Sequence, residues 1–271
     1  MVVQDRPQVP PTWVDTAVQA ARDASELIMQ VYATDFEVRG KDDASPVTEA
    51  DQRAEALIVP RLQALDASVP VVAEEAVAAG RVPTVGRRFW LVDPLDGTKE
   101  FISRNGEFTV NIALIEDGVP VLGVVLAPAL NRLYVGAQGQ GAWLDDGAGR
   151  RAIGCRDVPE EGLTVVASRS HGNPDALGRW LQGQVVARTI NAGSSMKLCL
   201  VACGEADLYP RFGRTMEWDI AAGHAVLSFA GGEVVDLQGN ALRYGKPGFD
   251  NPHFVARSGG RGGAAAAAHP R

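Results

Sequence analysis

The run that organises the chain reads Phe89-Trp90-Leu91-Val92-Asp93-Pro94-Leu95-Asp96-Gly97-Thr98, an apolar segment that gives way to two carboxylates, a glycine and a hydroxyl. Consecutive apolar residues are typical of a strand buried on both faces. Pro94 lacks the N–H that a ladder needs, so we expect the ladder to stop there, with the acids at the strand end. Asp93, Asp96 and the Leu95 carbonyl can then converge on one point, where hard oxygen ligands suit Mg²⁺. The alternative is an ordinary solvated turn whose Asp caps the next segment.

A second apolar segment also ends in acids. Residues 69–73 predict a short strand that runs directly into Glu74 and Glu75. If this strand neighbours the one at residues 89–92 in a single sheet, the two strand ends lie side by side. The pair of acidic strand ends therefore favours a metal site over a solvated turn.

Composition bounds the class of protein. The chain has 271 residues, of which 46% are hydrophobic and 22% charged, as in globular proteins, and its length predicts two subdomains or one large α/β unit. No apolar run approaches the ~20 residues that span a bilayer, and we expect no transmembrane segment and a cytoplasmic location. The net charge of −7 gives no basic footprint for polymeric nucleic acid. An acidic enzyme acting on anionic substrates needs cations to bridge them.

The first half is expected to combine helices with antiparallel strands. Residues 13–32 and 54–65 carry apolar side chains at helical spacing. Thr48 is the expected cap of the second helix, which puts Asp51 in its first turn, and Pro60 predicts a kink or an early end. Residues 36–48 are expected to form a mobile hairpin or loop.

A hairpin follows the central motif. Asp117-Gly118 separates two β-rich runs, residues 108–116 and 119–127, and is the strongest hairpin signal in the chain. Residues 133–137 predict one further strand. From Gln138 to Glu161 the sequence turns glycine-rich and charged, and we expect a crossing between subdomains there.

Strand-like and helix-like runs alternate in the second half, which predicts an α/β arrangement. The expected strands are residues 163–167, 185–190, 206–209, 233–237 and 253–256, and the expected helices are residues 174–181, 194–202 and 218–229. Asp219 falls in the first turn of the last helix, where an acid either compensates the helix dipole or serves a site. Cys155, Cys199 and Cys203 lack zinc-like spacing, and Cys199 and Cys203, four apart in an expected helix, are interpreted as small buried side chains.

These patterns predict an α/β protein with an α+β first half and an α/β second half. We expect residues 12–137 to form an N-terminal subdomain that carries most of the candidate metal ligands. Residues 138–257 would form a C-terminal subdomain that supplies Asp219 and substrate contacts, and residues 258–271 a disordered tail.

Three acidic motifs carry a resemblance to a known family. They are Glu74-Glu75, residues 93–98 and Trp218-Asp219-Ile220-Ala221-Ala222-Gly223. In this order and spacing they resemble the inositol monophosphatase superfamily of Mg²⁺-dependent, lithium-inhibited phosphatases, over roughly residues 13–256. The resemblance implies a layered αβαβα sandwich. Residues 93–101 and 104–115 look most like the bacterial branch of 3'(2'),5'-bisphosphate nucleotidases, whose role is to clear a by-product of sulfate assimilation.

The resemblance also implies roles for individual residues. The implied ligands of two or three Mg²⁺ ions are Glu74, Asp93, the Leu95 carbonyl, Asp96 and Asp219. Asp51 would orient Thr98, and the two would position a water and accept its proton. The chemistry agrees, because a metal lowers the pKa of bound water and stabilises charge on the attacking and leaving oxygens. Hydrolysis would then be direct, and the helix opened by Gly97 and Thr98 would cradle the phosphate.

Further residues are implied as substrate contacts. The implied set is Glu74, Leu95, Asp96, Gly97, Thr98, Ser168, His171, Gly193, Ser195, Lys197, Arg211 and Asp219. Inositol-cleaving members carry a carboxylate shortly before the Trp-Asp motif, whereas the loop here contains Arg211, which suits an additional phosphate. Glu217 could instead supply the polyol contact, and this keeps open the hypothesis that the protein is an inositol phosphatase.

Three hypotheses follow. The leading one is a Mg²⁺-dependent phosphatase that converts adenosine 3',5'-bisphosphate to AMP, acting as a monomer or homodimer. The second is a phosphatase of inositol phosphates or of fructose 1,6-bisphosphate. The third is a non-catalytic module that binds metal and polyanions, which the presence of both Asp51 and Thr98 argues against.

Overall fold

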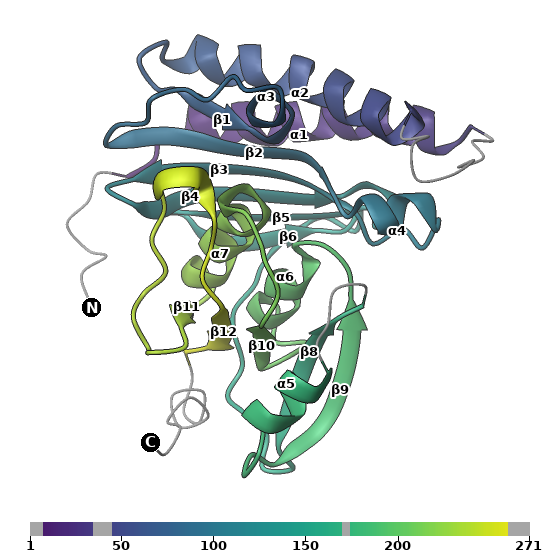
Figure 1. Cartoon of the computed structure of the whole chain (residues 1–271), viewed down its shortest axis with the longest axis vertical. Helices are drawn as coiled ribbons and strands as arrows, with labels where there is room; N and C mark the ends of the chain where they lie inside the picture. Colours follow the sequence, from purple (N-terminus) through teal and green to yellow (C-terminus); the bar gives the residue numbers. More distant parts are fainter. Residues whose placement is uncertain (1–7, 35–44, 170–173, 260–271) are drawn as a thin grey trace.

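The protein is built of five layers. Its computed structural model describes residues 8–34, 45–169 and 174–259, apart from the side chains of residues 45–48. A pair of helices covers a first sheet, two helices separate that sheet from a second one, and one helix covers the outer face of the second sheet (Figure 1). The expected α/β class and the αβαβα layering are confirmed.

The outer helices are α1 (Pro11–Tyr32) and α2 (Ser45–Leu65). Apolar residues at helical spacing form the buried faces: Val14, Ala17, Ala21 and Ile28 in α1, and Ala50, Ala54, Ile58 and Leu62 in α2. Both faces pack on the first sheet. The expected start of the second helix was wrong, because α2 already begins at Ser45 and Asp51 therefore lies beyond its first turn. Pro60 lies inside α2 and does not end it. Of the loop expected over residues 36–48, residues 36–44 lie outside the described residues, and residues 45–48 belong to α2.

The first sheet has the strand order β1-β2-β3-β4-β5-β6-β7. Its strands are β1 (Val71–Ala73), β2 (Arg88–Asp96), β3 (Thr109–Glu116), β4 (Val119–Ala127), β5 (Arg132–Ala137), β6 (Gly141–Asp145) and β7 (Arg150–Ala152). Within the part of the chain that the structure describes, only the β1–β2 pair of this sheet is parallel. Asp117 and Gly118 have φ of 52° and 70°, as a two-residue hairpin turn requires, so the hairpin is confirmed.

One expectation about this sheet was wrong. β2 does not stop at Pro94, because pairing with β3 resumes at Asp96 after a register shift. Asp93 pairs with Asn111 and Asp96 with Thr109, so Pro94 and Leu95 stand opposite one residue of β3, as in a β-bulge. Residues 138–161, where a crossing between subdomains was expected, begin with β6 and β7 of the first sheet, and the chain passes to the second sheet between Ala152 and Leu163. The division into subdomains stays a prediction.

The middle layer consists of α6 (Met196–Ala202) and α7 (Glu217–Phe229). Glycines in the first sheet let α7 approach closely. A Cβ at Gly123 of β4 would lie 2.2 Å from the carbonyl oxygen of Ala222, and one at Gly136 of β5 would lie 2.6 Å from the Cα of Val226. The helix backbone therefore rests directly on the sheet, and this contact places the first turn of α7, with Asp219, beside the end of β2.

The second sheet has the order β11-β12-β10-β8-β9. It contains β8 (Leu163–Ser168), β9 (Val186–Ala192), β10 (Leu208–Arg211), β11 (Gly232–Asp236) and β12 (Phe254–Ser258), with α5 (Pro174–Trp180) on its outer face. β8 is parallel to both β9 and β10, so their carboxyl ends meet at one edge. Ser258, expected in the tail, is the last residue of β12. Among the described residues, no helix is long and apolar enough to cross a membrane.

Candidate active site

Acidic residues from two neighbouring strands meet at one edge of the first sheet. β1 pairs with β2 in parallel, and Ala73 stands opposite Val92. Glu74, the first residue of the short helix α3 (Glu74–Ala78), therefore follows β1 at the level where Asp93 follows Val92. As expected, β1 and β2 are neighbours and Glu74 and Asp93 lie side by side, although Asp93 lies inside β2 and not at its end.

The turn after Asp93 is held by its own carboxylate. Asp93 is 1% exposed, and its Oδ1 accepts a hydrogen bond from the N–H of Leu95 at 3.1 Å. The bulge at Pro94 then brings Asp96 back to the sheet, and Gly97, with a φ of 99°, turns the chain into the short helix α4 (Thr98–Ile102). Gly97 and Thr98 thus open a helix as expected.

Asp219 comes from the middle layer. It lies in the first turn of α7, where its Oδ2 accepts a hydrogen bond from the N–H of Met216 at 2.9 Å. It therefore caps the helix, and it also lines a cavity of about 420 Å³ together with Glu74, Asp93 and Asp96. The cap at the start of α7 is therefore compatible with a role in the cavity.

Burial and mutual repulsion raise the pKa values of these acids. The pKa of Asp93 lies well above its usual range because the group is buried and faces Glu74, Asp96 and Asp219. Burial, with repulsion from Asp96, raises the pKa of Asp219 to about 8, and burial is also the main cause that raises the pKa of Glu74 to about 7. Asp96 shifts in the same direction by burial, against the opposing effect of Lys197 on its pKa.

The donor set of this end of the cavity fits Mg²⁺. Carboxylate and carbonyl oxygens are the ligands that this ion takes, and a cation among them would relieve the repulsion that raises their pKa values. Within the described part of the chain, no three Asp, Glu, His or Cys side chains form a closed metal-binding group. The fit therefore rests on the chemistry of the donors and not on a finished coordination shell.

Asp51 and Thr98 approach this cluster from its outer side. Asp51 of α2 is 8% exposed, and burial, followed by repulsion from Glu74 and Glu75, raises its pKa to about 8. Thr98, the first residue of α4, lines the cavity, and α2 contacts α4. Asp51 does not line the cavity itself, so any part it takes in the chemistry passes through a neighbour.

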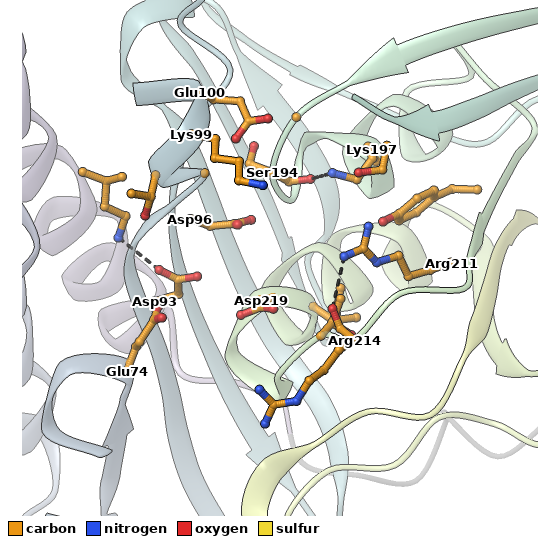
Figure 2. A pocket seen from close by; sticks show the side chains of 18 residues that line it. Glu74, Asp93, Asp96, Lys99, Glu100, Ser194, Lys197, Arg211, Arg214 and Asp219 are labelled. Carbon is orange, nitrogen blue, oxygen red and sulfur yellow. Dashed lines mark hydrogen bonds between the residues drawn. The ribbon is translucent and has the colours of Figure 1, made fainter. Parts of the chain in front are cut away.

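The opposite side of the cavity is cationic (Figure 2). Lys197 of α6 is 6% exposed, donates to the carbonyl oxygen of Ser194 and lies 5.5 Å from the ring centroid of Tyr209. Burial lowers the pKa of Lys197 to about 8. Arg211 is 9% exposed, and its Nη2 donates to the carbonyl oxygen of Arg214 at 3.1 Å. Arg211 was expected in a loop but is the last residue of β10.

Of the other residues implied as substrate contacts, some line the cavity and some do not. Ser168 and Gly193 line the cavity at the ends of β8 and β9, whereas Ser195 does not. Ser195 is 1% exposed and donates its hydroxyl hydrogen to the carbonyl oxygen of Asp219, so it holds the first turn of α7 from behind. His171 lies outside the described residues.

Several lining residues were missed by the sequence analysis. They are Lys99, Glu100, Ser194, Tyr209, Arg214, Thr215 and Ile220. For four of them the sequence offered a signal, because they adjoin residues that were expected in the site: Lys99 and Glu100 directly follow Thr98, Ser194 follows Gly193, and Ile220 follows Asp219.

Glu217 does not take the position of a polyol contact. The side chain is 0% exposed and does not line the cavity. Its Oε2 accepts from the N–H of Gly245 at 2.7 Å, and its Oε1 accepts from the N–H and the Nζ of Lys246 at 2.9 and 2.6 Å. All of these contacts tie α7 to the segment after residue 244.

Comparison with known proteins gives a consistent result. The chain is 50% identical over 244 residues to the 3'(2'),5'-bisphosphate nucleotidase CysQ of Salmonella typhimurium, covering 89% of this chain and 98% of the relative. The CysQ of Escherichia coli K12 is 49% identical over the same shares. The crystal structure of CysQ from Bacteroides thetaiotaomicron matches with a TM-score of 0.78 and 38% identity, covering 91% of this chain and 97% of that one. An inositol monophosphatase from Anabaena matches with a TM-score of 0.73 and 26% identity, over 94% and 93%. Residues 11–269 match the model of the inositol monophosphatase family, and the chain belongs to this family.

Proposed function

We propose that this protein is a Mg²⁺-dependent 3'(2'),5'-bisphosphate nucleotidase that hydrolyses the 3'-phosphate of adenosine 3',5'-bisphosphate to AMP and phosphate. The observation that carries the proposal is a single cavity with acids at one end and buried cations at the other. A substrate with two phosphates suits both ends at once. The names of the CysQ relatives, at up to 50% identity, support the same substrate class.

The acidic end is proposed as the site of hydrolysis. Glu74, Asp93, the Leu95 carbonyl, Asp96 and Asp219 would hold two or three Mg²⁺ ions. When bound, the metal supplies water of lowered pKa and stabilises charge on the attacking and leaving oxygens. Gly97 and Thr98 meet the scissile phosphate at the start of α4.

Asp51 and Thr98 are proposed to manage the proton of the attacking water. Asp51 is buried behind α4 and, once ionised, accepts a hydrogen bond from the Thr98 hydroxyl. The Thr98 oxygen then accepts one from the water and aligns it with the phosphorus. The proton passes toward Asp51, and no covalent bond forms between enzyme and substrate.

The cationic end is proposed to bind the remainder of the nucleotide. Arg211 offers its guanidinium and Lys197 its ammonium to the second phosphate, and Ser168 and Gly193 face the nucleoside. Ser195, first expected to touch substrate, is proposed to act through Asp219. His171 keeps its proposed contact, although it lies outside the described residues.

The alternatives are less well supported. Glu217 is engaged by Gly245 and Lys246, so the carboxylate that kept an inositol phosphatase open is not available to a polyol. A non-catalytic module would not need both Asp51 and Thr98 at the acidic end.

We further propose that this protein is a cytoplasmic enzyme of sulfate assimilation that acts as a monomer or homodimer.

The test is phosphate release with Mg²⁺ from adenosine 3',5'-bisphosphate, inositol 1-phosphate and fructose 1,6-bisphosphate at matched low concentrations. We expect kcat/KM for the nucleotide to exceed the others by at least about tenfold, or ~1.4 kcal/mol of transition-state stabilisation. A preference for either of the other substrates would contradict the proposed cationic end and leave the acidic end in place. Tight nucleotide binding without phosphate release would favour the non-catalytic module.

A further inference from the structure

One carboxylate near the first sheet holds two segments of the second sheet. Glu107 lies between α4 and β3, and its side chain receives three hydrogen bonds. Arg169 donates from Nη2 to Oε1 at 2.8 Å and from Nε to Oε2 at 2.9 Å, and the N–H of Gly193 donates to Oε2 at 2.8 Å. The two parallel bonds from Arg169 fix the geometry of the pair, as bidentate contacts do.

Both of the segments held by Glu107 reach the cavity. Arg169 directly follows Ser168 at the end of β8, and Gly193 and Ser194 directly follow β9. Ser168, Gly193 and Ser194 all line the cavity, whereas Glu107 and Arg169 do not. Arg169 Nη2 also donates to the carbonyl oxygen of Asn191 at 3.0 Å, which ties the two segments to each other.

The turn at Gly193 and Ser194 depends on being anchored. Ser194 has a φ of 45°, which is a left-handed conformation. This conformation is unfavourable for a residue that has a side chain, and it persists only where neighbouring residues enforce it. A Cβ at Gly193 would lie 2.6 Å from the Cγ of Glu100 and 2.8 Å from the carbonyl oxygen of Glu107, so the turn is pressed against the segment before β3. The Ser194 carbonyl in turn accepts the hydrogen bond from Lys197.

We propose that Glu107 and Arg169 are positioning residues that set the separation between the acidic and the cationic ends of the cavity. The pair would thereby favour substrates that carry a second anionic group beyond the scissile phosphate. The inference rests on the proposed function and deepens it, because it names residues that select the substrate without touching it. They act through Ser168, Ser194 and Lys197.

The test is the variant Glu107→Gln, which keeps the size of the side chain but presents an amide donor to the donors of Arg169. Kinetics are measured with adenosine 3',5'-bisphosphate and with p-nitrophenyl phosphate, a small ester with one phosphate. We expect the ratio of kcat/KM for the nucleotide over the small ester to fall about tenfold, through a higher KM for the nucleotide with its kcat within about twofold. The matched control is Glu233→Gln, since Glu233 of β11 also pairs with an arginine, Arg257, at 2.7 Å and does not line the cavity.

The ion pair of Glu107 and Arg169 is called the clamp from here on. A double-mutant cycle distinguishes a clamp that acts as one unit from a direct contact between Arg169 and the substrate. If the pair acts as one unit, Glu107→Gln combined with Arg169→Ala loses little more selectivity than the larger single change. Additive losses would mean that Arg169 binds the substrate itself, and would overturn the proposal. Arg169→Ala alone tests the clamp from its other side if Glu107→Gln does not fold.

Three further outcomes are distinguishable. Equal losses for both substrates in Glu107→Gln, with a lowered Tm, would indicate a merely structural role and overturn the clamp. If the unchanged protein prefers the nucleotide but Glu107→Gln behaves like Glu233→Gln, the clamp fails and the proposed function stands. If the unchanged protein has no preference for the nucleotide, the proposed function itself fails.

Discussion

Asp93 is the most deeply buried member of the acidic end. It is 1% exposed, accepts the N–H of Leu95 at 3.1 Å, and faces Glu74, Asp96 and Asp219. Burying a carboxylate among like charges costs free energy, so this residue stabilises the protein little beyond its turn. Its position is therefore better explained by what it binds than by the fold.

Asp93→Asn separates the contribution of the hydrogen bond with Leu95 from that of the negative charge. The amide keeps the size of the side chain and the acceptor for Leu95, but it removes a negative charge from the proposed metal ligands. We expect kcat/KM to fall by more than about a hundredfold, since even changes to residues that only support ligands cost 10–100-fold. The Tm in Mg²⁺-free buffer should stay equal or rise, because repulsion is relieved.

The control for that variant is Asp15→Asn, which changes an exposed carboxylate of α1 away from the cavity. Initial rates and thermal unfolding of both variants check the prediction. Mg²⁺-dependent turnover that survives in Asp93→Asn would contradict the metal ligands proposed here.

At the scale of single residues, the sequence predicted where the acids lie in the fold better than it predicted what each side chain faces. The acids that follow the two apolar runs could be found because parallel neighbours place equivalent positions at the same level of the sheet, as Glu74 and Asp93 show. Ser195 and Glu217 could not be assigned in this way. Both are buried beside the motifs, and only the packing of α6 and α7 decides that one faces the Asp219 carbonyl and the other faces Gly245.

At the scale of elements, α7 carries Asp219 to the site through its contact with the first sheet. Gly123→Ala tests this contact, because the added Cβ would lie 2.2 Å from the Ala222 carbonyl oxygen, one turn from Asp219. Overpacking costs roughly 1–3 kcal/mol of stability. We expect that loss in urea unfolding, together with a lower kcat as the first turn of α7 shifts. Gly86→Ala is the matched control, since a Cβ there meets nothing within 4 Å, and equal behaviour of the two variants would contradict the close approach.

The departures from the predicted elements, at β7 and β2, have separate physical causes. β7 is an exposed edge strand of Arg150, Arg151 and Ala152, so it carries no buried alternation from which to recognise it. β2 continues past Pro94 because a bulge takes Pro94 and Leu95 out of the ladder, and the missing N–H is then not needed. The hairpin at Asp117-Gly118 was predictable because its signal is local.

At the scale of the whole molecule, the acids of the site come from separate layers. Asp51 belongs to the outer helices, Glu74 and Asp93 to the edge of the first sheet, and Asp219 to the middle layer. Folding therefore brings together charges that are far apart in the sequence. The metal binding proposed for this cluster would therefore be linked to the stability of the entire chain.

This linkage predicts how stability depends on pH when Mg²⁺ is chelated. The pKa values of Asp51 and Asp219 are raised from 3.8 to about 8 by burial and repulsion, and that of Glu74 is raised from 4.5 to about 7. Between these limits the folded protein binds more protons than the unfolded one, so its stability is greatest below about pH 4 with respect to these groups and falls as the pH rises toward 8. In EDTA we expect the free energy of unfolding to fall by about a few kcal/mol from pH 5 to pH 8, and the Tm to decrease with it.

Saturating Mg²⁺ should flatten this pH profile of the Tm, because binding to the folded state alone stabilises it and favours the ionised acids. Asp93→Asn should have a shallower slope in EDTA than Asp15→Asn, which leaves the cluster intact. A Tm in EDTA that stays level or rises over this range would mean that the acids do not repel one another in the folded protein, and the metal site inferred from their convergence would fall with that result.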